Sequence, residues 1–156
     1  MFTLKERTEV YRLGLNCGFF SKDEVIHWVD KQIVQIPNPD YVLIEVSLLN
    51  QSKSIDISYK LKELEGKQRE GYAVNILLGL CYMELLKNRF SDDDICFFLG
   101  NIRNSDALSD EGTIRVIDVL TGEYYLARRQ IYGSLKIASA NIRGFLIGFK
   151  PYAEEF

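Results

Sequence analysis

The chain has little of what metal centres and catalytic sites are usually built from. It contains one histidine, His27, and three cysteines that lie far apart, Cys17, Cys81 and Cys96. A single imidazole excludes sites that need several histidines, and no two cysteines have the spacing of a zinc or redox motif. We therefore expect no metal, no cofactor and no catalytic constellation, and we expect the cysteines to act as small buried hydrophobic residues.

Long hydrophobic runs are also missing. The most apolar segment, Tyr72–Leu86, is shorter than the roughly 20 residues of a membrane span, and Asn75 and Glu84 interrupt it. The first residues mix both charges and have no apolar core, unlike a signal peptide. The sequence therefore predicts a cytoplasmic protein that does not bind membranes.

Basic charge is in deficit, which makes nucleic acid an unfavourable partner. The 156 residues carry a net charge of −3, and residues 91–111 alone carry six acidic side chains and one basic one, a net −5. Nucleic-acid binding depends on cations that neutralise phosphates. An acidic segment is instead a candidate surface for a protein partner. Its acidic residues are Asp92, Asp93, Asp94, Asp106, Asp110 and Glu111.

The composition and the local signals predict an all-α protein, a single irregular helical bundle over residues 1–156. Its 47% hydrophobic and 26% charged residues are normal for one globular domain. Thr3 with Glu6, and Ser21 with Glu24, have the spacing of capping boxes, in which two side chains satisfy free N–H groups at a helix start. Pro37 ends the second of these helices.

The later part of the chain predicts further helices. The run 41–49 fits a short helix or a buried strand, and Asp40 before it favours the helix because aspartate caps helix N-termini. Residues 69–88 predict a central helix, since they are apolar nearly all the way round. After a helix from Ser91 to about residue 100, we expect a helix from Ser109 that breaks at Thr121-Gly122, and then a long helix over residues 123–143.

Asp92-Asp93-Asp94 has two interpretations. Calcium loops space their carboxylates at alternate positions around a glycine turn, which this run does not do. Directly after Ser91, three negative charges favour a helix N-terminus. Helix capping is therefore the favoured interpretation, and it is compatible with a contact surface.

A basic and aromatic patch follows at Arg128-Arg129 with Tyr124, Tyr125 and Tyr132. Such groups stack on bases and bind phosphates. In a net-acidic chain, a helix face with half-buried tyrosines and solvated arginines is the favoured interpretation.

The segment Tyr11–Asp30, with glycine-leucine, glycine-phenylalanine, serine, two acidic residues, tryptophan and aspartate in order, resembles an uncharacterised family of small helical bacterial proteins. The run Tyr41–Leu49 continues the similarity. Some members of this family are regarded as immunity proteins, which bind and block a cognate toxin. The resemblance implies a helical fold and a toxin domain as partner, and it identifies no functional residue.

Three functional hypotheses follow. The first is a protein-binding module, specifically an immunity protein, for which the acidic residues of segment 91–111 are the candidate contact surface. The second is a structural or oligomeric helical scaffold. The third is an enzyme that uses carboxylates such as Asp30, Glu45 or Glu84 in a helical pocket.

Overall fold

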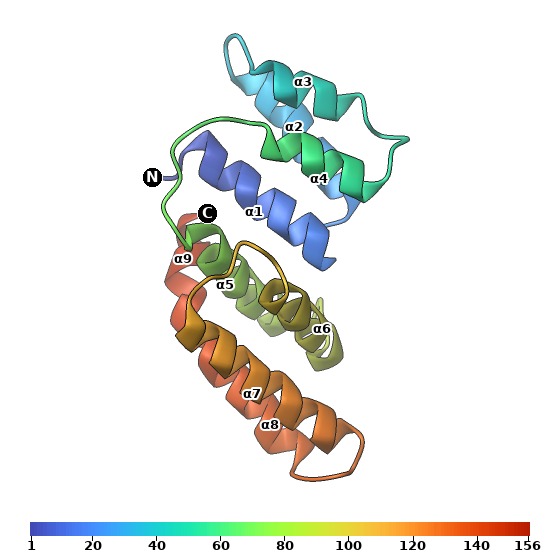
Figure 1. Ribbon diagram of the computed structural model, residues 1–156, viewed down its shortest axis with the longest axis vertical. Coiled ribbons are helices and arrows are strands. Elements are labelled where there is room, and N and C mark those ends of the chain that lie inside the picture. The colour runs from blue at the N-terminus through green and yellow to red at the C-terminus, as the bar shows by residue number, and fades with distance from the viewer. The chain divides into compact units, whose positions relative to one another are not determined.

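The computed structural model describes residues 1–156, and it contains helices and no strand, which confirms the all-α prediction (Figure 1). The helices form two compact units, Met1–Glu70 and Gly71–Phe156. That the chain is one domain stays a prediction. The first unit holds α1 (Leu4–Cys17), α2 (Lys22–Gln35), α3 (Tyr41–Ser47) and α4 (Ser54–Lys62). The second holds α5 (Tyr72–Leu86), α6 (Asp92–Arg103), α7 (Glu111–Arg128), α8 (Leu135–Leu146), the 3-10 turn η1 (Ile147–Phe149) and α9 (Lys150–Glu155).

Local capping signals set three of the four helix starts of the first unit, those of α1, α2 and α3. Both predicted capping boxes are present, at Thr3 with Glu6 and at Ser21 with Glu24. Asp40 caps α3 by accepting a hydrogen bond from the backbone N–H of Val42 at 2.8 Å, so the ambiguous run is a helix.

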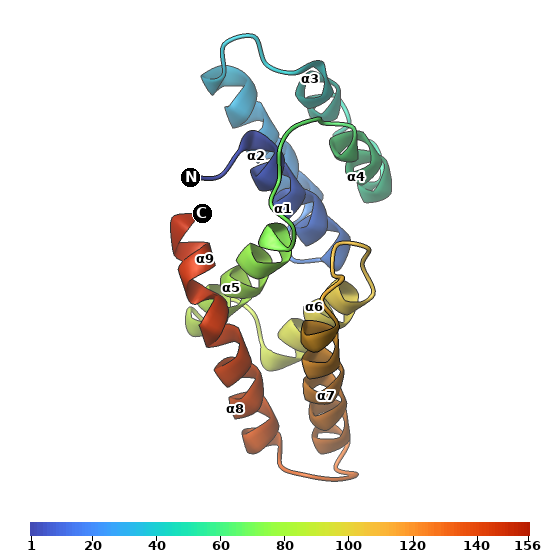
Figure 2. The same cartoon turned by 60° about the vertical axis from the view of Figure 1, so that its left-hand side comes forward.

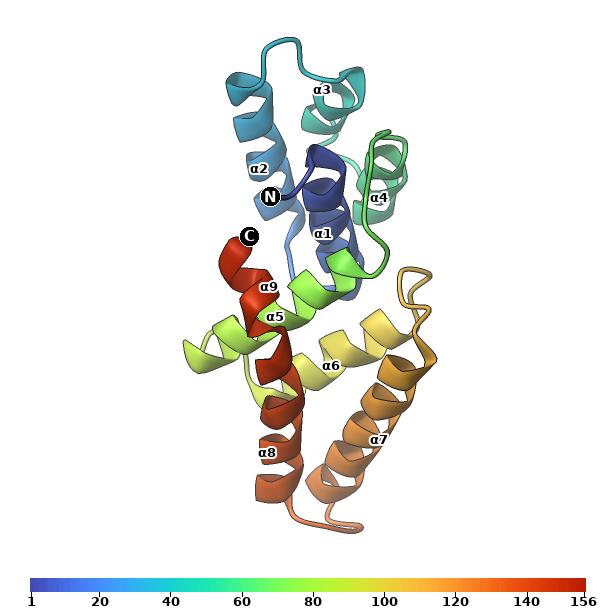
Figure 3. The same cartoon turned by 90° about the vertical axis from the view of Figure 1, so that its left-hand side faces the viewer.

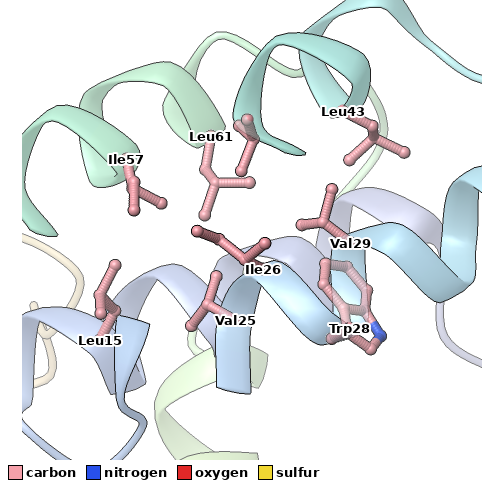
Figure 4. Packing of buried hydrophobic residues seen from close by; sticks show 9 residues of the cluster. Leu15, Val25, Ile26, Trp28, Val29, Leu43, Ile57 and Leu61 are labelled. Atoms are coloured by element: carbon pink, nitrogen blue, oxygen red, sulfur yellow. The ribbon is translucent and has the colours of Figure 1, made fainter. Parts of the chain in front are cut away.

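Side chains from all four helices make the core of this unit (Figure 4). Non-directional burial of apolar surface is therefore what holds the four short helices together. The buried members are Leu15, Val25, Ile26, Trp28, Val29, Leu43, Val46, Ile57 and Leu61.

Glu6 also ties the end of the first unit back to its beginning. Its carboxylate accepts hydrogen bonds from the backbone N–H of Arg69 at 3.0 Å and from the Arg69 guanidinium at 2.8 and 3.0 Å. The hydroxyl of Thr3 donates to the carbonyl of Lys67 at 2.6 Å. The Arg69 hydrogen bonds lower the pKa of Glu6 from its usual 4.5 to about 2.

Replacing this carboxylate is expected to weaken the fold in a pH-dependent way. Because the pKa of Glu6 is lowered by folding, its stabilisation is present above about pH 4.5 and is lost as the pH falls towards 2. Glu6→Gln should cost about 1–3 kcal/mol of unfolding free energy at pH 7. Urea unfolding should show that this cost shrinks at pH 3. The exposed neighbour Glu65, changed to Gln, is the control, and a cost that stays constant with pH would contradict the assignment.

The second unit is built around α5, which packs against α9. Gly79 of α5 lies against the backbone of Phe149 and the side chain of Ala153, and its lack of a side chain permits this close approach. Figure 2 shows α7 and α8 lying side by side, joined by a turn at one end. None of the helices combines the length and the apolarity needed to cross a membrane.

One predicted break is wrong. Helix α7 runs through Thr121-Gly122 without interruption, because the Thr121 hydroxyl donates to the carbonyl of Ile117 at 2.8 Å and so is satisfied inside the helix. The chain turns later, where Gln130 and Gly133 have positive φ angles of 58° and 82°. Ser134 then caps α8. The predicted helix over residues 123–143 is therefore the end of one helix, a turn and most of the next.

Candidate partner-binding surface

The acidic segment 91–111 does not form one patch. Asp92, Asp93 and Asp94 begin α6, whereas Asp106, Asp110 and Glu111 follow its end. The nine residues of α6 that follow Asp94 span about 14 Å at a rise of 1.5 Å per residue, so the two groups lie at opposite ends of this helix. Figure 3 shows α6 leading through a loop into α7. The two acidic groups therefore face different neighbours.

The first acidic group is engaged within the unit. Asp94 completes a capping box with Ser91, as the capping interpretation predicts. Asp92 forms an ion pair with Arg143 of α8 at 3.3 Å. Asp93 accepts a hydrogen bond from the hydroxyl of Tyr124 at 2.5 Å and pairs with Arg128 at 3.4 Å.

The second acidic group is exposed. Asp110 caps α7 by accepting from the backbone N–H of Thr113 at 2.9 Å and from its hydroxyl at 2.7 Å, and these hydrogen bonds lower the pKa of Asp110. Glu111 pairs with Arg115 at 3.4 Å, and the two side chains are 84% and 77% exposed. Asp106 lies on the loop between the two helices and is also exposed. Solvent screening makes the exposed pair of Glu111 and Arg115 weak. Most of the negative charge of this second group therefore faces solvent.

A groove of about 360 Å³ lies along α6 and α7, and we call it the α6–α7 groove. Aromatic rings and arginines dominate its lining, a composition that is enriched where proteins bind each other. The lining residues are Asp93, Cys96, Phe97, Thr121, Tyr124, Tyr125, Arg128 and Arg129.

Two rings of the groove are open to solvent. Phe97 is 63% exposed and Tyr125 is 52% exposed, whereas Tyr124 is 7% exposed. The guanidinium of Arg129 lies over the Tyr125 ring, 4.7 Å from its centroid. Four residues of the predicted basic and aromatic patch, Tyr124, Tyr125, Arg128 and Arg129, line this groove, whereas Tyr132 does not. The three tyrosines of the patch were predicted to be half-buried. Tyr124 is more buried than this, and Tyr125 and Tyr132 are more exposed.

The thiols of the chain are suited to packing rather than to chemistry. Cys17 and Cys81 are buried, and Cys96 is half-buried in the groove. Burial raises the pKa of Cys17 and Cys96 to about 12, so neither carries a reactive thiolate at neutral pH. His27 lies exposed on α2.

The three carboxylates that an enzyme would use, according to the third hypothesis, lie on three different helices. Asp30 is exposed on α2. Glu45 of α3 pairs with Lys60 of α4 at 2.8 Å. Glu84 of α5 pairs with Arg89 at 3.3 Å. Each of the two glutamates thus forms a local ion pair.

Phe97 is the main surface residue that the sequence analysis missed. A signal for it exists in the sequence. Helix α6 buries Ile95, Phe98, Leu99 and Ile102 on its inner face, and Phe97 does not belong to that face. A large apolar side chain on the outer face of an amphipathic helix is a detectable exception.

Comparison of the chain with protein-family models, with curated proteins and with solved structures gives no match.

Proposed function

We propose that the chain is a protein-binding module that holds its partner at the α6–α7 groove, and that the partner is a toxin domain which the chain neutralises as an immunity protein. The observation that carries the binding role is the pair of exposed rings, Phe97 and Tyr125, lining one groove. The neutralising role is supported by the resemblance of Tyr11–Asp30 to the family described above.

The energetics favour this surface as an interface. An aromatic side chain buries roughly 150–250 Å² when it is fully covered. At about 25 cal/mol per Å², covering the 63% of Phe97 that is exposed contributes about 2–4 kcal/mol. Arg129 already lies against Tyr125, so this ring and its cation lose little conformational freedom on binding.

Charge along α7 gives the surface a direction. Glu111 begins the helix and Arg128 ends it, and this helix of 18 residues is about 27 Å long. The exposed acidic residues Asp106, Asp110 and Glu111 are therefore far from the arginines of the groove. After the pairs Glu111–Arg115 and Asp93–Arg128 are set aside, Asp106 and Asp110 at one end and Arg129 at the other still orient a partner of complementary charge.

Co-expression with the product of the gene next to its own tests the proposal. We expect the two proteins to co-purify and the chain to protect growth against that product. Phe97→Ala combined with Tyr125→Ala should weaken the complex at least tenfold and remove protection, because central aromatic residues dominate interface energies. Tyr59→Ala, which truncates a ring that is 66% exposed on α4, should leave both unchanged. The absence of both complex and protection would remove the proposed function.

A further inference from the structure

We infer that the α6–α7 groove takes an acidic segment of the partner, with an apolar side chain between Phe97 and Tyr125 and the carboxylate of an adjacent residue on Arg129. This inference rests on the proposed function and specifies the chemistry of what the groove binds. Three features of the groove support it: its two rings, the state of its two arginines and the way its own carboxylate is engaged.

Arg129 is the cation that remains available. Its guanidinium stacks on Tyr125 at 4.7 Å and forms no ion pair within the chain. A guanidinium that lies over a ring makes this contact without using its N–H donors, and these donors match the two oxygens of a carboxylate. Stacking therefore prepares Arg129 to bind an anion with little loss of side-chain freedom.

Asp93, the only acidic residue in the groove lining, does not prevent Arg129 from binding an anion. Asp93 uses one oxygen, Oδ1, to accept from the Tyr124 hydroxyl and from Nε of Arg128. The Tyr124 hydrogen bond lowers the pKa of Asp93, so this carboxylate stays charged and balances Arg128. One positive charge, that of Arg129, is then left over among the lining residues.

The rings require an apolar group beside the anion. Phe97 and Tyr125 line the same groove, and each is more than half exposed. An anion alone would leave these rings in water, whereas an apolar side chain covers them. Acidic and apolar residues in adjacent positions of a peptide satisfy both requirements.

Three short peptides test the inference directly. The probe is acetyl-Phe-Glu-amide, and the comparisons are acetyl-Phe-Gln-amide, which lacks the charge, and acetyl-Ala-Glu-amide, which lacks the ring. NMR shifts of the amides of residues 93–97 and 121–129, and of the Arg129 side chain, report binding. We expect saturable shifts with a dissociation constant on the order of 1 mM. At low salt, each of the two comparison peptides should bind about fivefold more weakly than acetyl-Phe-Glu-amide.

Two variants separate charge from fold. Arg129→Gln should remove the preference for Glu over Gln, whereas Arg115→Gln, at the other end of α7 and 77% exposed, should keep it. Equal binding of the Glu and Gln peptides would overturn the inference while leaving the groove as a docking surface. Absence of saturable shifts with acetyl-Phe-Glu-amide would also overturn it. The proposed function is judged separately, by complex formation and growth protection.

Discussion

Glu9→Ala is expected to destabilise the protein by about 3–5 kcal/mol. The Glu9 carboxylate lies between two cations of its own helix, 2.9 Å from Nζ of Lys5 and 2.7 Å from Nη2 of Arg12. All three side chains are at most 9% exposed. Removing the carboxylate leaves two buried cations without their counter-ion, and desolvated charges are costly when unpaired.

An exposed pair with similar spacing provides the control for Glu9. Lys150 and Glu154 of α9 are also four residues apart and 3.5 Å from each other, but their side chains are 42% and 54% exposed. Solvent screening makes such pairs weak, so Glu154→Ala should change the unfolding free energy by less than about 0.5 kcal/mol. Chemical denaturation of the two variants measures both values. Similar losses for both would contradict the buried network on α1.

Gly79→Ala should cost about 3 kcal/mol, the upper end of the range for overpacking. A Cβ at this position of α5 would collide with the carbonyl oxygen of Phe149 and would lie 2.9 Å from Cβ of Ala153. The first of these atoms belongs to the backbone, so it cannot move aside as a flexible side chain does. The helices would have to separate, which exposes the apolar surface between α5 and α9.

A glycine-to-alanine substitution at Gly144 should have the opposite effect on stability. Gly144 lies in α8, and a Cβ there would meet no atom within 4 Å. Alanine favours the helix over glycine by about 0.5–1 kcal/mol, so Gly144→Ala should stabilise the protein by that amount. Thermal unfolding compares the two variants. If both variants raised the midpoint of thermal unfolding, this result would contradict the close contact between α5 and α9 at Gly79.

The sequence predicted four helix starts, those of α1, α2, α3 and α6, because capping is local, but it missed the start of α8 at Ser134. Thr3, Ser21, Asp40 and Ser91 each receive a hydrogen bond from an N–H two or three residues later, and such spacings can be read without a fold. The predicted helix break at Thr121-Gly122 was wrong because a threonine hydroxyl can be satisfied inside a helix. The sequence alone did not indicate that the helix would instead end at the turn over residues 129–134.

The candidate surface could be predicted only in part. Counting charges identifies the acidic segment, but it cannot show that Arg128 and Arg143 return to Asp93 and Asp92 across 35 and 51 residues. The arginines and tyrosines of the groove were visible as a cluster in the sequence. Their exposure depends on how α7 rotates against α6, and that is decided by long-range packing.

Side-chain footprinting of the free protein and of its complex with the co-expressed partner tests the binding surface most directly. Hydroxyl-radical oxidation should fall several-fold at Phe97 and Tyr125 when the partner binds. Tyr41 and Tyr59, which are 70% and 66% exposed on the first unit, should be oxidised as before. Protection of Tyr41 and Tyr59 with no change at Phe97 and Tyr125 would contradict the α6–α7 groove as the site where the partner is held.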